Sequence, residues 1–346
     1  MKAALFGLGM VAETHVRALA DAAPAVSLAG ICARDPAKAA AYAEKVAPIL
    51  GAAPHVYSDV ASVASDAEVD FTIICTPPNA RADLVAPLAQ AGKAILMEKP
   101  LERDFAAARQ IIETCDAANV AHGVVFQHRM RESSQRLAKM LAEGALGDLA
   151  VAEIVVPWWR EQSYYDEPGR GTYARDGGGV LISQAIHTLD LALSLLGPVT
   201  RVQAMARTSA LHKMEAEDFV TAGLEFESGM IGSLVASTAS HPGGAESITL
   251  HGSKASVVLV SGQLNMTWRD GRTETIGEAG GTGGGADPMA FTHAWHQAVI
   301  TDFAEALQTG RKPAADGHSA LIVHQLIDAI IESSNAGHAV TLPRAA

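Results

Sequence analysis

The chain has 346 residues, of which 49% are hydrophobic and 18% are charged, and its formal net charge at pH 7 is −12. This length exceeds one ordinary core, so we expect two domains, and the apolar content excludes a disordered chain. The acidic balance disfavours nucleic acid or an anionic membrane as a partner.

The first predicted elements form the context of a dinucleotide site. A short apolar strand from Lys2 to Phe6 leads into a glycine turn, and residues 13–22 have helical composition. In such a turn the first glycine allows the tight bend, the second lets the backbone approach a pyrophosphate, and the helix N-terminus supplies amide donors. Ala12 stands in place of the third glycine. We expect a dinucleotide to bind at Gly7, Gly9, Met10 and Val11.

The second predicted strand, Val26 to Ile31, ends where the adenine ribose of a dinucleotide is recognised. Ala33 and Arg34 follow it, instead of an acidic residue that would bind a 2′-hydroxyl and repel a 2′-phosphate, which favours NADP. Asp35 lies one step further and leaves NAD open. Alternatively, Asp35 and Pro36 simply begin a helix, as its N-cap and first residue.

The alternation of strands and helices continues and predicts a parallel sheet of about six strands within residues 1–122. The further elements are strands at 70–76, 94–97 and 120–125, with helices ending near Ala91 and spanning about 104–118. Thr76, Pro77 and Asn79 follow a strand and are candidate cofactor residues, although the proline pair is equally compatible with a rigid turn.

The strand from Ala94 to Met97 runs directly into Glu98, Lys99 and Pro100. Ligands of open α/β sheets bind at the carboxyl ends of the strands. Pro100 restricts the backbone of Lys99, and desolvation can lower the pKa of a lysine until it takes part in proton transfer. We expect Glu98 at the cofactor and Lys99 at the cofactor, the substrate and the reacting centre. The alternative is a surface lysine that follows a strand.

The pattern changes after residue 127 and predicts a second α/β domain, residues 123–346, with a large, mostly antiparallel open sheet. A helix at 132–143 and a strand at 148–156 precede segments with strand alternation, with hairpin signals at 227–229 and 252–254. Helices at 288–307 and 317–334 end the chain. We expect the glycine-rich stretch 278–287 to be a mobile loop, with a phosphate cradle as the alternative.

An apolar helix between the glycine triplet that starts at Gly177 and the stop signal Gly197-Pro198 carries a polar stripe. The stripe consists of Ser183, His187, Asp190 and Ser194. A histidine is suited to general acid–base work at neutral pH, whereas the alternative is a structural histidine bonded to Asp190. Hydride transfer from an alcohol needs a nicotinamide, a base and a cation, and the glycine turn, His187 and Lys99 are one candidate for each.

The cysteines and the N-terminus point to a cytoplasmic protein. Three cysteines in no metal-ligand spacing predict neither a disulfide framework nor a metal site. The N-terminus lacks the pattern of a signal peptide, and no apolar stretch reaches the roughly 18 residues of a membrane span.

The glycine turn, Glu98-Lys99-Pro100 and the helix with His187 and Asp190 together resemble the Gfo/Idh/MocA family nearly from end to end. The resemblance implies a Rossmann domain followed by an α/β domain, a nicotinamide cofactor, sugar or polyol substrates, and dimers or tetramers formed through the second sheet. By position, Lys99 matches the active-site lysine and His187 the catalytic histidine. Many members have an aspartate four residues before that histidine, where this chain has Ser183, which cannot serve as a charged partner.

Residues and resemblance together predict NAD(P)-dependent oxidation of a secondary alcohol on a sugar-like compound, with His187 as general acid/base and Lys99 holding the reacting oxygen. The candidates for binding substrate are Lys99, Arg129, Tyr164, Tyr165, Arg170, Tyr173, Ser183, Gln184 and His187. Trp158 and Trp159 are candidates for stacking on a sugar, and His241, His293 and His296 are weaker ones. The alternatives are a dinucleotide-binding sensor and an enzyme that uses the nicotinamide only transiently.

Overall fold

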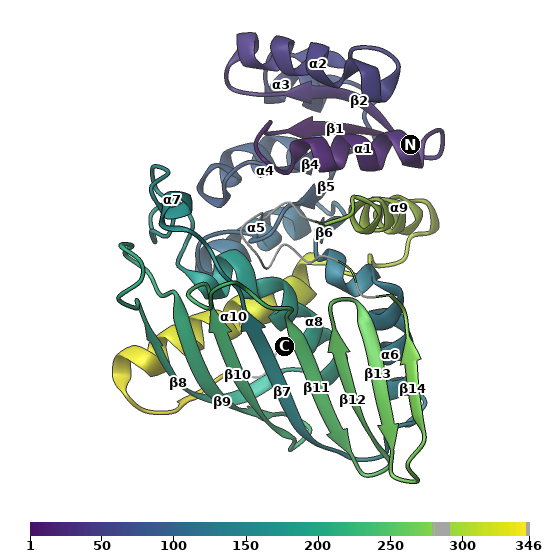
Figure 1. Ribbon diagram of the computed structural model, residues 1–346. Coiled ribbons are helices and arrows are strands. Elements are labelled where there is room, and N and C mark those ends of the chain that lie inside the picture. Colours follow the sequence, from purple (N-terminus) through teal and green to yellow (C-terminus); the bar gives the residue numbers. More distant parts are fainter. Residues whose placement is uncertain (279, 281–290, 344–346) are drawn as a thin grey trace. The chain divides into compact units, whose positions relative to one another are not determined.

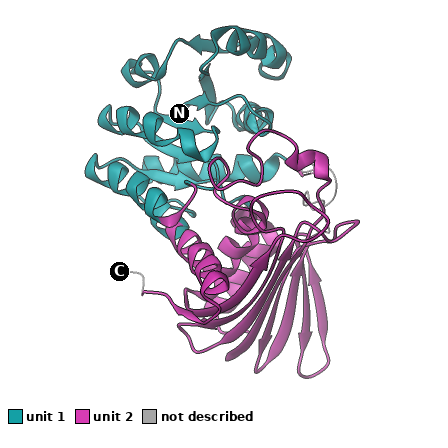
Figure 2. Cartoon of the chain, turned by 90° about the vertical axis from the view of Figure 1, so that its left-hand side faces the viewer, with its two compact units in different colours: residues 1–102, 106–127, 292–320 teal, residues 103–105, 128–291, 321–346 magenta. Residues whose placement is uncertain are grey.

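The computed structural model describes residues 1–278, 280 and 291–343. The chain forms two compact units, which Figure 2 shows in teal and magenta. Unit 1 comprises residues 1–102, 106–127 and 292–320, and unit 2 comprises residues 103–105, 128–291 and 321–346. This division differs from the expected domains 1–122 and 123–346: the expected boundary falls inside strand β6 (His122–Val124), and residues 292–320 return to unit 1.

Six of the described strands form the parallel sheet of unit 1, in the order β3-β2-β1-β4-β5-β6. They are β1 (Lys2–Phe6), β2 (Ser27–Cys32), β3 (His55–Tyr57), β4 (Phe71–Ile74), β5 (Ala94–Met97) and β6 (His122–Val124). This is the strand order of a Rossmann fold, and it confirms the expected fold of the N-terminal part. The order reverses between β1 and β4, where such sheets bind their ligands.

Short helices connect the strands of unit 1 (Figure 1). They are α1 (Ala12–Ala22), α2 (Pro36–Leu50), α3 (Val60–Ser65), η1 (Pro78–Ala80), α4 (Ala82–Gln90) and α5 (Phe105–Ala117). The unit is completed by α9 (Ala294–Thr309), which packs against α1. Phe303 of α9 contacts Phe71 at 5.4 Å between ring centroids. The face of α9 that carries Phe303 is buried within unit 1, which explains why a segment so late in the chain belongs to the first unit.

Nine of the described strands form the sheet of unit 2, in the order β14-β13-β12-β11-β7-β10-β9-β8-β15. They are β7 (Leu149–Pro157), β8 (Val199–Arg207), β9 (Phe219–Phe226), β10 (Ile231–Ser237), β11 (Ser247–Gly252), β12 (Ala255–Val260), β13 (Gln263–Trp268), β14 (Thr273–Ile276) and β15 (Val340–Thr341). β7 and β10 pair in parallel and the other neighbours pair antiparallel. The expected large, mostly antiparallel sheet is therefore confirmed.

Helices cover one face of this sheet (Figure 1). The helical segments of unit 2 are η2 (Gln127–Met130), α6 (Glu132–Ala142), α7 (Gln162–Tyr165), a π-helical turn η3 (Leu181–Ala185), α8 (Ile186–Leu196) and most of α10 (Gly317–Ala336). Ser333 and Ser334 of α10 accept bonds from the backbone of β8, at 3.0 Å from Ala204 N and 2.8 Å from Ala206 N. In the described part of the chain, no helix is both long and apolar enough to cross a bilayer.

Most expected elements agree with the structure to within two residues at either end. The exception is the expected helix 288–307, since the described helix α9 begins at Ala294. Its first residues, 288–290, lie outside the described residues, as does most of the glycine-rich stretch 278–287.

Candidate active site

The glycine turn after β1 lies in close contact with the backbone at the ends of the neighbouring strands. Gly7 has φ +87°, and a Cβ added there would lie 2.8 Å from the carbonyl carbon of Cys75 and from the nitrogen of Thr76. Its own N–H donates to Cys32 O at 3.2 Å. Gly9 is exposed, and an added Cβ would meet no atom within 4 Å. The turn therefore leaves open backbone where a pyrophosphate can approach, which fits a dinucleotide.

The other expected cofactor residues lie at the same edge of the sheet. Backbone bonds join the strand exits, from Cys75 N to Phe6 O at 2.7 Å and from Glu98 N to Ile74 O at 2.9 Å. Thr76 is half-buried, and its Oγ1 has no partner among the described residues. The remaining candidates are Met10, Pro77 and Asn79, which are exposed, and Val11 and Ala33, which are half-buried.

Asp35 begins helix α2, as one of the two interpretations predicted. Its carboxylate accepts bonds from Ala37 N at 3.0 Å and Lys38 N at 3.2 Å, and Pro36 is the first helical residue. These bonds occupy Oδ1 of Asp35, while the side chain of Arg34 is exposed at the end of β2.

A buried arginine, Arg81, holds the segment that carries Lys99. Its side chain is 2% exposed and donates to Thr76 O at 3.0 Å and to the carbonyl oxygens of Glu98 and Pro100. Burial lowers its pKa to about 10, so it stays a cation at neutral pH. Arg81 thus fastens the exits of β4 and β5 to each other, on either side of a half-buried Lys99. Arg81 is not among the residues predicted from the sequence, where the available signal was an arginine among small apolar residues after a strand.

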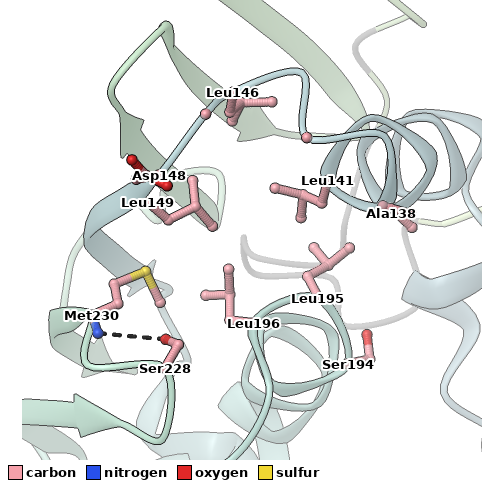
Figure 3. A pocket seen from close by; sticks show the side chains of 13 residues that line it. Ala138, Leu141, Leu146, Asp148, Leu149, Ser194, Leu195, Leu196, Ser228 and Met230 are labelled. Carbon is pink, nitrogen blue, oxygen red and sulfur yellow. Dashed lines mark hydrogen bonds between the residues drawn. The ribbon is translucent and has the colours of Figure 1, made fainter.

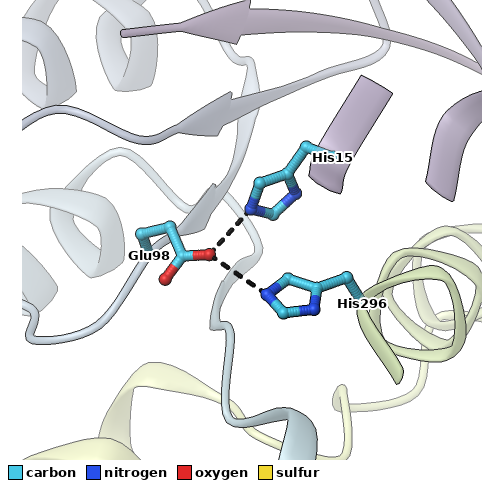
Figure 4. A group of neighbouring side chains, drawn as sticks. All are labelled: His15, Glu98 and His296. Atoms are coloured by element: carbon cyan, nitrogen blue, oxygen red, sulfur yellow. Dashed lines mark hydrogen bonds and ion pairs between the residues drawn. The ribbon is translucent and has the colours of Figure 1, made fainter. Parts of the chain in front are cut away.

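Glu98 is paired with two histidines of unit 1 (Figure 4). Its Oε1 lies 2.7 Å from Nε2 of His15 and 3.6 Å from Nε2 of His296, and all three side chains are buried. Burial disfavours the charged ring of His15, but Cys75 and Glu98 outweigh it and raise its pKa to about 10. Burial also lowers the pKa of His296, while the two histidines hold the pKa of Glu98 well below its usual value. The cluster is therefore a His15–Glu98 ion pair beside a neutral His296.

Two groups of described side chains have the spacing of metal ligands, and the members of each are joined by hydrogen bonds or ion-pair contacts. One is the cluster of His15, Glu98 and His296, and the other consists of Asp116, His122 and His318. In the second, Gly317 N donates to Nδ1 of His122 at 3.1 Å, which leaves the proton on Nε2, 3.0 Å from Asp116. That nitrogen is a donor to the carboxylate, so the arrangement suits a hydrogen-bonded pair better than a metal site.

The helix that carries His187 is anchored at its start by a buried carboxylate. Glu217 accepts bonds from Gly179 N at 3.2 Å and from Leu181 N at 3.1 Å. The π-helical turn η3 follows, and then α8 begins directly before His187, which is 7% exposed. π-Helical turns occur frequently at functional sites, where they redirect the side chains that follow.

Asp190 is bound to Arg129 rather than to His187. Nε of Arg129 donates to Oδ2 of Asp190 at 2.8 Å, and Nη2 donates to Oδ1 at 2.6 Å. Burial raises the pKa of Asp190, and the guanidinium counteracts this rise. The ring of His187 stacks instead on His128, at 5.0 Å between centroids and 26° between planes.

Two expected substrate residues, Arg170 and Gln184, contact a third, Tyr164. The guanidinium of Arg170 lies 5.0 Å from the ring centroid, and the amide of Gln184 donates to the hydroxyl at 3.4 Å. Gln184 is 3% exposed, and its Oε1 has no partner among the described residues. Tyr173 is 44% exposed, and Ser183 is half-buried. By contrast, Tyr165 is buried and its hydroxyl bonds to Thr238 at 2.6 Å.

The remaining candidates, two tryptophans and two histidines, contact other side chains of the protein. Trp158 is buried under Arg160, and the ring of Trp159 contacts that of His241 at 5.2 Å between centroids. His293 lies 2.7 Å from a carboxylate oxygen of Asp21.

A pocket of about 660 Å³ in unit 2 is separate from these residues (Figure 3). It lies where the C-terminal ends of α6 and α8 meet the start of β7, and leucines such as Leu141, Leu149 and Leu195 form much of its wall. None of the residues expected to bind cofactor or substrate lines it.

Comparison with protein families identifies the class of protein. The model described as "Oxidoreductase family, NAD-binding Rossmann fold" matches residues 1–126, and the "GFO/IDH/MocA C-terminal domain" matches residues 134–258. The chain belongs to the GFO/IDH/MocA family of oxidoreductases, and its N-terminal part is an NAD-binding Rossmann domain. The expected family and fold are thereby confirmed.

Two of its relatives are dehydrogenases that match over nearly their whole length. Inositol 2-dehydrogenase of Rhizobium meliloti is 27% identical over 339 residues, which cover 95% of both chains. D-apiose dehydrogenase of Rhizobium rhizogenes is 26% identical over 360 residues, covering 99% of this chain and 97% of the relative. The crystal structure of the WlbA dehydrogenase from Bordetella pertussis, in complex with NADH and UDP-GlcNAcA, has a TM-score of 0.81 at 26% identity and covers 99% of both chains.

Proposed function

We propose that this enzyme catalyses the reversible NAD(P)-dependent oxidation of a secondary alcohol on a sugar, polyol or sugar derivative. The observation that carries the proposal is the buried Arg81, which fastens the backbone on both sides of Lys99 at the dinucleotide edge of the sheet. A fixed lysine at that edge can bind a substrate oxygen beside a cofactor. The named substrates of two relatives, inositol and D-apiose, are polyhydroxy compounds of the proposed class.

In this proposal the cofactor is held at the glycine turn and the neighbouring strand ends. The residues that would hold it are Gly7, Gly9, Met10, Val11, Ala33, Arg34, Thr76, Pro77, Asn79 and Lys99. Glu98, which was expected to bind the cofactor, is not included in this proposal, because both its carboxylate oxygens already accept bonds within unit 1. The bound nicotinamide supplies the hydride acceptor.

Two side chains of the chain act on the substrate hydroxyl. The ammonium of Lys99 donates a hydrogen bond to the reacting oxygen and stabilises the negative charge that develops there. His187 takes up the hydroxyl proton as general base, and returns it in the reverse direction.

Other substrate hydroxyls are bound by Tyr164, Arg170, Tyr173, Ser183 and Gln184. The support is the cluster around Tyr164 and the buried Oε1 of Gln184, which a substrate hydroxyl can satisfy. Arg129 and Tyr165 are not included among the proposed substrate-binding residues. Arg129 forms a bidentate pair with Asp190, and the Tyr165 hydroxyl bonds to Thr238.

The preferred cofactor in this proposal is NADP. Arg34 presents an exposed cation after β2, and the carboxylate of Asp35 is engaged in capping α2. A cation at this place favours a 2′-phosphate.

We further propose that the enzyme is a dimer or tetramer formed through the uncovered face of the nine-stranded sheet. Most of its central positions carry apolar or small side chains, among them Val155, Ile231, Val235 and Val258, and Glu153 is a charged exception. Ile231 is 57% exposed in the single chain. A broad, weakly charged face of this kind is typical of an interface between copies.

The test is a titration of purified protein with NADH and NADPH, followed by nicotinamide fluorescence, and then assays with inositols, aldoses and anhydrosugars. We expect tight binding of a reduced nicotinamide cofactor and its turnover with one class of polyhydroxy compound. Tight binding without turnover on any of these compounds would contradict the proposed reaction, and no binding at all would contradict the proposed cofactor site.

A further inference from the structure

The orientation of the His187 ring depends on the groups packed around it. The χ2 torsion of a histidine has a broad energy profile, so the ring turns unless its surroundings hold it. One turn before His187 stands Ser183, whose side chain is an uncharged hydroxyl. One turn after it stands Asp190, whose two carboxylate oxygens accept bonds from Arg129 at 2.8 and 2.6 Å.

His128 contacts the face of the His187 ring. The two rings lie 5.0 Å apart between centroids with 26° between their planes, which is a stacked arrangement. His128 is 3% exposed and His187 is 7% exposed, so the pair is surrounded by protein. A flat neighbour packed on one face opposes rotation about χ2, because a turned ring would collide with it.

The segment that carries His128 is itself bound to helix α8. The next residue, Arg129, forms the bidentate pair with Asp190, which lies three residues after His187 on the same helix. Two successive residues of η2 therefore contact α8 about one turn apart: His128 through the stack and Arg129 through the ion pair. The ion pair fixes the distance from η2 to α8, and the stack fixes the plane of the His187 ring.

We propose that His128 is a positioning residue that holds the imidazole of His187 in the orientation for proton transfer. The proposal rests on the proposed function, in which His187 is the general acid/base. General bases act only when the nitrogen lies within hydrogen-bond reach of the proton, so a rotating ring loses rate. The part that His128 contributes is its flat, buried ring, and not a charge.

The kinetic test compares His128→Ala with His128→Phe, which keeps a flat ring. We expect His128→Ala to lower kcat by about 10- to 100-fold, the size typical of misplaced catalytic groups. KM and the affinity for the reduced cofactor should change little, and His128→Phe should restore most of the rate. His318→Ala, which removes a histidine that is 54% exposed, is the control and should behave as wild type. A wild-type kcat in His128→Ala would overturn the proposal, as would a His128→Phe variant as slow as His128→Ala.

A second measurement does not depend on activity. In protein labelled with 15N-histidine, the ring nitrogens of His187 are identified by the signals lost in His187→Asn. We expect sharp ring signals in the wild type and His128→Phe, and signals broadened by ring motion in His128→Ala. Unchanged signals in His128→Ala, with a melting temperature like that of the wild type, would refute the role of the stack. If the wild type oxidises no sugar or polyol, the proposed function fails, while these spectra still decide whether His128 orients the ring.

Discussion

Oε1 of Glu98 lies 2.7 Å from Nε2 of His15, while Oε2 of the same carboxylate accepts the backbone N–H of Lys99 at 3.2 Å. His15 belongs to α1, the helix that begins after the glycine turn, and Glu98 follows β5. The ion pair therefore connects the helix expected to face the pyrophosphate with the segment that carries Lys99. Because both side chains are buried, removing either one leaves its partner as a buried charge without the opposite charge of the pair.

The ion pair of His15 and Glu98 should stabilise the fold in a pH-dependent way. We expect His15→Gln to lower the free energy of unfolding by about 3 kcal/mol at pH 6, as loss of one partner of a buried pair does. The pKa of His15 is raised to about 10, so its contribution is full below the unfolded value near 6.5 and is lost as the pH rises toward 10. Urea unfolding at pH 6, 8 and 10 measures the difference between variant and wild type. A difference that stays constant over this range would contradict the assignment of the charge to His15.

The pair of Arg129 and Asp190 should show the cost of an uncompensated buried charge. We expect Arg129→Met to destabilise the protein by about 3–5 kcal/mol and the double variant Arg129→Met/Asp190→Leu to recover much of this loss. The control is Arg201→Met, since Arg201 and Glu225 form a pair that is about half exposed and is worth less than about 1 kcal/mol. Urea denaturation of these three variants and the wild type provides the comparison, and a double variant no more stable than Arg129→Met would count against a coupled pair.

Gly7→Ala should be more harmful than alanine at another glycine with the same backbone conformation. Gly7 has φ +87° and Gly51 has φ +81°, but only at Gly7 would the new Cβ meet backbone atoms, at 2.8 Å. Gly51→Ala is therefore expected to cost about 1–2 kcal/mol from the left-handed backbone alone. Gly7→Ala should cost more and should also weaken binding of the reduced cofactor, measured by its fluorescence. Equal effects of the two substitutions would show that the close approach at Gly7 is unimportant.

Lys99→Met should abolish most turnover while the cofactor still binds. Methionine keeps much of the length of lysine but cannot donate to the reacting oxygen, so we expect kcat to fall by about 10²- to 10⁴-fold. Steady-state kinetics and cofactor fluorescence measure the two effects separately. The matched control is Lys139→Met on α6, where the lysine is 66% exposed. Near-normal turnover of Lys99→Met would refute the role proposed for Lys99.

Arg34→Ala tests the proposed cofactor preference. If Arg34 pairs with a 2′-phosphate, its loss should weaken binding of NADPH by about tenfold, the effect of one exposed charge-assisted contact, and leave NADH nearly unchanged. The ratio of the two dissociation constants, measured by fluorescence titration, reports this directly. A wild-type ratio in the variant would remove the support for NADP.

Much of the fold was predictable because its signals are local. The apolar strand before Gly7, the alternation of strands and helices, and the stop signal at Gly197-Pro198 are patterns within short windows, and each was confirmed. The start of α2 was predicted by one of two interpretations, since Asp35-Pro36 is also a local pattern. The membership of residues 292–320 in unit 1 was not predictable in this way, because nothing within α9 indicates which sheet its apolar face covers.

In the candidate site, too, local sequence patterns were predictable and contacts between distant segments were not. By itself, the sequence determined where Lys99 and His187, the residues proposed for the chemistry, stand along the chain: one follows a strand and one lies on a helix, as periodicity and stop signals predict. Only the tertiary structure decided their neighbours: Glu98 binds His15, 83 residues earlier, and Arg129 binds Asp190, 61 residues later. The physical reason is that backbone periodicity depends on adjacent residues, whereas the partner of a buried charge is chosen by chain segments that meet only after folding.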